Sequence, residues 1–72
     1  MRKTPHPLLQ SIGRQIRRTR TARGWSQEVL AAEAGIDRSY MSGIERGVRN
    51  ISVLKVARIA HVLGVPISKL LG

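Results

Sequence analysis

Residues 26–47, SQEVLAAEAGIDRSYMSGIERG, have the pattern of two short helices joined by a tight turn. Ser26 is a preferred N-cap residue, and Glu28 places negative charge in the first turn, where the helix dipole favours it. Gly35 can adopt the left-handed conformation that ends a helix, and Asp37 can cap the next one. The stretch therefore predicts helices over 26–33 and 37–46, with a short turn between them.

The second of these helices has two different faces. Met41 and Ile44 are spaced so that both point inward. The outward face carries hydrogen-bond donors and one aromatic ring, on Arg38, Ser39, Tyr40 and Ser42. In a helix-turn-helix, the first helix braces across the DNA backbone and the second puts its N-terminal residues against base edges in the major groove. The pattern therefore favours binding to double-stranded DNA.

Three motifs resemble those of the lambda-repressor-like and Cro-like (XRE-type) repressors: W-S-Q-E-x-L-A at 25–31, A-G-I at 34–36 and I-E-R-G at 44–47. The resemblance runs from about Leu9 to Leu71. Within that family the chain is most similar to the controller proteins of restriction–modification systems, because of D-R-S-Y at 37–40 and R-N-I-S at 49–52. The resemblance implies a compact all-α, five-helix domain that regulates transcription, with control of restriction endonuclease expression as the specific role.

Outside the central pair, apolar residues at helical steps predict two longer helices, over 8–23 and 52–63. Gly24 and Gly64 are placed to end them, and Ser52 can cap the second.

The two ends of the chain have shorter elements. Pro66 suits the first turn of a short helix over 66–71. Residues 1–7 contain two prolines and two basic residues without periodicity, which predicts a flexible basic arm; contact of this arm with phosphates is the alternative. The predicted DNA-binding domain thus covers 8–72.

The composition narrows the class of partner. The 72 residues suffice for one domain and include no Cys, which excludes disulfide scaffolds, thiol catalysis and Cys-based zinc sites. There are 13 Lys and Arg against 4 Asp and Glu, a formal net charge of +9. Such an excess favours a polyanionic partner, and Arg gives bidentate contacts to phosphate or guanine. Charge alone does not separate DNA, RNA and anionic lipid, whereas charge combined with the motif favours DNA.

The predicted DNA contacts divide by role. Arg38 is the candidate for a bidentate contact to guanine, with Ser39 and Ser42 as weaker base contacts. Contacts to the DNA backbone are expected from the amino end of the first helix of the pair and from residues within and after the second: Ser26, Gln27, Tyr40, Arg46, Arg49 and Asn50. Tyr40 is expected to donate its hydroxyl to a phosphate or to stack on the sugar edge, with packing of its ring as the alternative.

The resemblance also implies an ion pair. In the family, a residue at the position of Arg20 pairs with the glutamate of the I-E-x-G motif, which is Glu45 here. We therefore expect a partly buried Arg20–Glu45 pair that fixes the recognition helix, over 37–46, against the helix over 8–23. Removing one partner would leave an uncompensated buried charge.

Two glycines lie inside predicted helices, where glycine costs about 1 kcal/mol relative to alanine. Gly13 and Gly43 therefore indicate close approach of a neighbouring group. For Gly43 that neighbour is either DNA or the helix over 8–23.

A homodimer is expected, because one helix-turn-helix reads few base pairs. Two-fold symmetry would place it on a near-palindromic site with half-sites about 34 Å apart. The candidate interface consists of apolar residues near the end of the chain: Ile51, Val53, Val65, Ile67, Leu70 and Leu71. The alternative is that these residues complete the core of the monomer.

Other classes of function fit the sequence less well. An antitoxin or a phage-type repressor would share the fold, whereas a cationic membrane-active protein would need one amphipathic basic stripe. No enzyme is predicted, and no cofactor, metal or small-molecule ligand is evident, since His6 and His61 stand far apart and no nucleophile motif surrounds a serine. Without a signal peptide or membrane span, the chain is expected in the cytoplasm.

Overall fold

The computed structural model describes residues 6–72. Most of the predicted arm, residues 1–5, lies outside this range. The described part of the chain forms α1 (Pro7–Ala22), α2 (Gln27–Ala34), α3 (Arg38–Arg46), α4 (Val53–Leu63) and α5 (Ile67–Leu71). The predicted all-α fold of five helices is confirmed, and each helix end lies within one residue of its predicted position.

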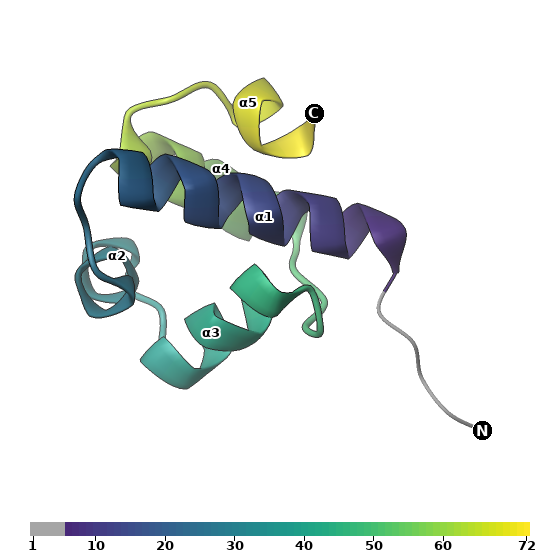
Figure 1. Ribbon diagram of the computed structural model, residues 1–72, viewed down its shortest axis with the longest axis horizontal. Coiled ribbons are helices and arrows are strands. Elements are labelled where there is room, and N and C mark those ends of the chain that lie inside the picture. Colours follow the sequence, from purple (N-terminus) through teal and green to yellow (C-terminus); the bar gives the residue numbers. More distant parts are fainter. Residues whose placement is uncertain (1–5) are drawn as a thin grey trace.

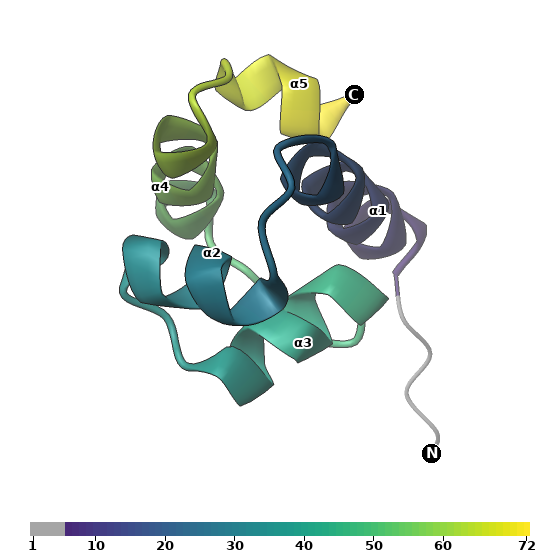
Figure 2. The same ribbon diagram turned by 60° about the vertical axis from the view of Figure 1, so that its left-hand side comes forward.

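The helices surround one apolar core. α1 lies between the α2–α3 pair on one side and α5 on the other, with α4 behind it (Figure 1). When the molecule is rotated about the vertical axis, α2 and α3 lie below α4 and α1, and α5 lies above them (Figure 2). Every helix contributes a side chain with no exposed surface: Ile16, Leu30, Met41, Ile59 and Leu70. Among residues 6–72, every helix is too short or too polar to traverse a lipid bilayer.

The helix-turn-helix pair has side-chain caps at its starts and left-handed glycines at its ends. Ser26 Oγ accepts the amide of Val29 at 3.1 Å, and the Asp37 carboxylate accepts two amides in the first turn of α3. Gly35 and Gly47 have φ of +67° and +75°, which only glycine adopts without strain. These local signals fix where α2 ends and α3 begins, and hence the angle between them.

The chain differs from the prediction at two prolines. Pro7 is the first residue of α1, and His6 Nδ1 accepts the amide of Leu8 at 3.0 Å as a cap. Proline suits that position because a helix leaves the first amides unpaired. Pro7 therefore belongs to α1 and not to the predicted arm. Pro66 is the N-cap of α5 rather than a residue of its first turn.

One residue of the predicted dimer interface belongs to the monomer core. Leu70 has no exposed surface, because α5 packs over the core and inserts this side chain into it. A side chain without exposed surface cannot contact a second copy, so the prediction for Leu70 is wrong. Val65 and Ile67 are half-buried against the same core, whereas Leu71 remains 41% exposed.

Candidate nucleic-acid interface

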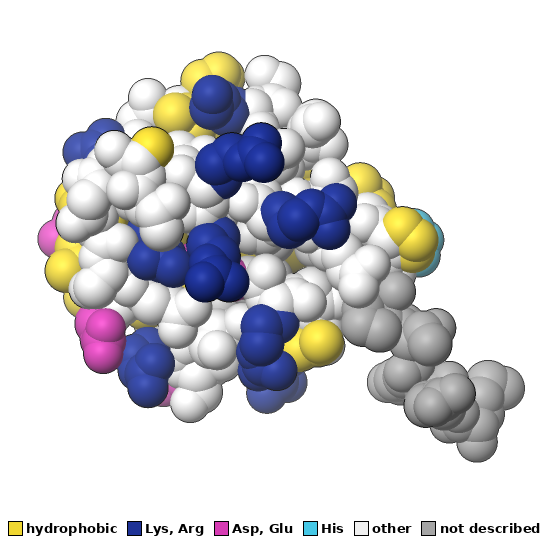
Figure 3. Space-filling model, in the orientation of Figure 1, with side chains coloured by type: hydrophobic (Ala, Val, Ile, Leu, Met, Phe, Trp, Pro, Cys, Tyr) yellow, Lys and Arg dark blue, Asp and Glu magenta, His cyan; other side chains and the backbone are white. Residues whose placement is uncertain are grey.

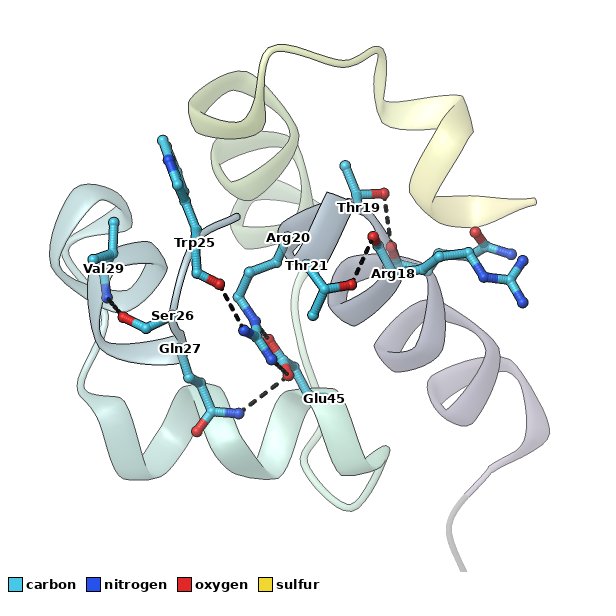
Figure 4. A network of polar contacts seen from close by, with 10 residues as sticks. Arg18, Thr19, Arg20, Thr21, Trp25, Ser26, Gln27, Val29 and Glu45 are labelled. Atoms are coloured by element: carbon cyan, nitrogen blue, oxygen red, sulfur yellow. Dashed lines mark hydrogen bonds and ion pairs between the residues drawn. The ribbon is translucent and has the colours of Figure 1, made fainter. Parts of the chain in front are cut away.

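A shielded ion pair joins α1 to α3 (Figure 4). Arg20 Nε and Nη2 donate to the two carboxylate oxygens of Glu45 at 2.7 and 2.9 Å. The side chains of Arg20 and Glu45 are only 10% and 3% exposed. Hydrogen bonding to Glu45 raises the pKa of Arg20, while burial acts in the opposite direction. The pair that the resemblance implies is thus present, and it holds the recognition helix against α1.

Two further hydrogen bonds extend this network to α2. Arg20 Nη1 donates to the carbonyl of Trp25 at 2.9 Å, and Gln27 Nε2 donates to Glu45 Oε1 at 3.1 Å. Because Gln27 is the first residue of α2, the amino end of α2 is tied directly to the last turn of α3 (Figure 4). One N–H of the Gln27 amide is used in this way. A contact from its side chain to phosphate must come from the other N–H.

The amino end of α2 keeps polar groups that point to solvent. Ser26 Oγ accepts a helix amide, which leaves its hydroxyl proton available as a donor. The first turn of any α-helix has four amides without helical partners and the positive end of the helix dipole. This end can therefore hold an anion.

The first turn of α3 presents the predicted base contacts. Arg38 and Ser39 are exposed, and Ser42 is half-buried one turn later. Arg38 Nε lies 3.8 Å from Glu28 Oε2, with 59% and 69% of the two side chains exposed. An exposed pair at this distance holds its members weakly. Arg38 is thus placed at the edge between α2 and α3 and can exchange Glu28 for another partner. Sequence reasoning did not identify Glu28 as that partner.

The loop after α3 folds back onto the recognition helix. The Tyr40 hydroxyl donates to the carbonyl of Asn50 at 2.7 Å, and the Arg49 guanidinium lies 5.4 Å from the centre of the Tyr40 ring. A Cβ at Gly43 would lie 2.5 Å from Arg49 Cγ. The missing side chain of Gly43 therefore makes room for Arg49 to lie along α3.

These contacts correct two predictions. Tyr40 does not have its hydroxyl proton free for a phosphate in this structure, because the carbonyl of Asn50 already accepts it. Gly43 neither packs against α1 nor lies open to DNA, since Arg49 covers it. Gly13 does mark a close approach: a Cβ there would lie 2.5 Å from the backbone oxygen of Ile44 in α3.

The remaining predicted backbone contacts lie after the recognition helix. Arg46, Arg49 and Asn50 are all exposed. Sequence reasoning missed Lys55, whose Nζ lies 5.7 Å from the centre of the Tyr40 ring. No local pattern could have placed a residue of α4 beside α3.

Positive charge dominates the surface of the described residues. Only three carboxylate side chains are exposed there, those of Glu28, Glu33 and Asp37. The exposed basic side chains are those of Arg14, Arg17, Arg18, Arg23, Arg38, Arg46, Arg49, Lys55, Arg58 and Lys69. In the view of Figure 3, Lys and Arg side chains gather over α1 and continue toward the end of α3. This surface suits a polyanion.

Comparison with known proteins finds the same motif in regulators. The helix-turn-helix family model HTH_3 matches residues 16–70. Control protein C.BamHI of Bacillus amyloliquefaciens is 42% identical over 55 residues, which cover 75% of this chain and 68% of that protein. A hypothetical transcription factor of Neisseria meningitidis serogroup B is 43% identical over 56 residues. That match covers 78% of this chain and only 53% of the Neisseria protein, so the chain spans about half the length of this relative.

The likeness extends to solved structures. The restriction-modification controller protein C.AhdI from Aeromonas hydrophila matches with a TM-score of 0.83 and 44% sequence identity. The match covers 86% of this chain and 94% of that protein. The two folds thus agree over most of this chain and nearly the whole of that controller protein.

Proposed function

The chain belongs to the HTH_3 helix-turn-helix family, and from that premise we propose that it is a sequence-specific DNA-binding regulator of transcription of the restriction–modification controller type. The observation that carries the proposal is the network of Arg20, Gln27 and Glu45. It holds the amino end of α2, the phosphate-binding helix, against the last turn of α3, the base-reading helix. Preorganisation of this kind lowers the entropic cost of binding, because fewer conformations are lost when the complex forms.

The amino end of α2 sets the register on the duplex. A phosphate placed there meets unpaired helix amides, the dipole of α2, the Ser26 hydroxyl and the second N–H of Gln27. Because Gln27 also donates to Glu45, a phosphate bound at α2 is fixed relative to the last turn of α3.

Arg38 reads the sequence. Its guanidinium exchanges the weak contact with Glu28 for two hydrogen bonds to O6 and N7 of a guanine. Ser39 and Ser42 add single hydrogen bonds to neighbouring base edges. Loss of an exposed ion pair costs little, so the exchange favours the base contact.

The far side of the groove is contacted by the loop after α3. Arg46, Arg49 and the side chain of Asn50 are exposed and face the DNA backbone. Arg49 is held in place by Gly43 and by the ring of Tyr40. The role of Tyr40 is therefore to position the loop.

Dimerisation would use the start of α4. Val53 and Leu54 are 70% and 82% exposed, the two most exposed large apolar side chains of the described residues. Ile51 lies next to them and is half-buried. The other predicted residues, Val65, Ile67 and Leu71, lie beyond the carboxyl end of α4, in the following loop and in α5. The predicted residues therefore divide into two groups, and we place the two-fold axis near Val53 and Leu54.

Selection of bound duplexes from random DNA tests the proposal. We expect enrichment of two inverted half-sites whose centres lie about 34 Å apart. Occurrence of the selected site upstream of a restriction endonuclease gene would support the controller role. Its occurrence only at other promoters would indicate a regulator of other genes. Absence of any enriched sequence contradicts sequence-specific binding.

A further inference from the structure

Three arginines of α1 have no part in the interface proposed above. Arg14, Arg17 and Arg18 are exposed, and none of them forms an ion pair within residues 6–72. At spacings of three and four they share one side of the helix. We call these three residues the α1 ridge. Like charges at such spacings destabilise a helix, so a bound anion would relieve a repulsion that exists in the free protein.

One member of the α1 ridge, Arg17, adjoins the recognition helix, whereas Arg18 lies on the side of α5 and lines a pocket with Lys69. Gly13 and Arg20 face α3, through a backbone contact to Ile44 and the ion pair with Glu45. Arg17 follows Gly13 by one helical turn and precedes Arg20 by nearly one, so it lies at the rim of the α1–α3 contact. The basic surface in Figure 3 accordingly continues from the end of α3 over α1.

The α1 ridge also faces away from the proposed dimer axis. α4 lies behind α1 in Figure 1, on the side opposite to the exposed face of α1. A two-fold axis near Leu54 at the start of α4 puts the α1 ridge of each protomer on the outer side of the dimer. The DNA nearest to that side is the duplex beyond each half-site.

We propose that the α1 ridge binds the sugar–phosphate backbone of the DNA that flanks each half-site, an inference that rests on the proposed function. Guanidinium groups form charge-assisted hydrogen bonds to phosphate without reading bases. The flanks therefore contribute affinity and salt dependence but no sequence preference. Bending of the duplex toward α1 would bring more phosphates within reach of the three side chains.

The test compares two duplexes that carry the same selected site. One ends at the outermost selected base pair, and the other is extended on each side by one helical turn, about 10 bp. The variant Arg14→Gln/Arg17→Gln removes two ridge charges. The control Arg58→Gln removes a charge from α4, whereas Lys69 is left in place because it lines the same pocket as Arg18 of the ridge. For each protein we measure the affinity for both duplexes and take the ratio of the two affinities. Each protein thereby serves as its own reference.

The wild-type protein should bind the long duplex more tightly, and the ridge variant should lose that advantage while the control keeps it. On the long duplex, the slope of log K against log salt should fall by about 2 per protomer, near 0.9 for each lost phosphate contact. Equal weakening on both duplexes would overturn the proposal in favour of a net-charge effect, and unchanged binding would show a merely solvated face. If the wild-type protein selects no DNA at all, the proposed function itself fails.

Discussion

Arg20 and Glu45 stand 25 positions apart in the sequence and form two hydrogen bonds across the contact between α1 and α3. Both side chains are largely shielded from water. Glu45→Gln keeps the shape of the side chain but leaves the charge of Arg20 without its counter-charge. We expect the free energy of unfolding to fall by about 3–5 kcal/mol, measured by urea denaturation.

The matched control is Glu28→Gln. Glu28 is also paired with an arginine, but that pair is 3.8 Å long and exposed to solvent. Its loss should change the free energy of unfolding by about 0–1 kcal/mol. Similar effects of the two substitutions would show that burial does not distinguish these pairs.

Gly13→Ala should destabilise the protein although alanine is the better helix former. The added Cβ would lie 2.5 and 2.6 Å from the backbone oxygens of Ile44 and Glu45, and α3 cannot move away without disturbing the ion pair. We expect the steric overlap to cost about 1–3 kcal/mol of the free energy of unfolding. This cost should outweigh the gain of about 1 kcal/mol from the higher helix propensity of alanine. Thermal denaturation provides the measurement.

Gly43→Ala serves as the comparison, because the atoms nearest to its Cβ would belong to the side chain of Arg49 and not to the backbone. That side chain can rotate away, so the stability should stay nearly unchanged or rise. If Gly43→Ala proves as harmful as Gly13→Ala, glycine at both positions serves helix packing in general rather than one backbone contact.

The helix boundaries could be predicted because their causes are local. Ser26 and Asp37 cap the residues that follow them, and Gly35 ends a helix through its own φ. None of these signals depends on a distant part of the chain. The Arg20–Glu45 pair is not local, and only the family resemblance indicated it.

The errors arise where tertiary packing decides. Leu70 and Val53 are both apolar residues of short amphipathic helices, yet one has no exposed surface and the other is 70% exposed. Leu70 is buried because α5 docks on the core, and the sequence pattern alone does not define the angle at which it docks. The hydrogen bond from Tyr40 to Asn50 likewise depends on the path of a loop without a regular pattern.

Arg38→Ala should relax the base preference at one position of each half-site. A bidentate contact to guanine provides about 1–3 kcal/mol of discrimination, so the enriched guanine should become degenerate when site selection is repeated. Arg49→Ala is the contrasting variant: it should weaken binding to all sequences alike and lower the salt slope by about 1. Uniform weakening by Arg38→Ala would make Arg38 a phosphate contact as well.

Substitution of Leu54 should affect dimerisation and leave stability unchanged, whereas substitution of Leu70 should lower stability. Leu54 is 82% exposed, so Leu54→Glu should leave the fold of the monomer intact while placing charge in the proposed dimer contact. Sedimentation should then show monomers at concentrations where the wild-type protein is dimeric. Leu70→Ala removes a fully buried side chain and should instead lower the free energy of unfolding by about 2–5 kcal/mol. A Leu54→Glu protein that still dimerises would move the interface to α5, where Leu71 is 41% exposed.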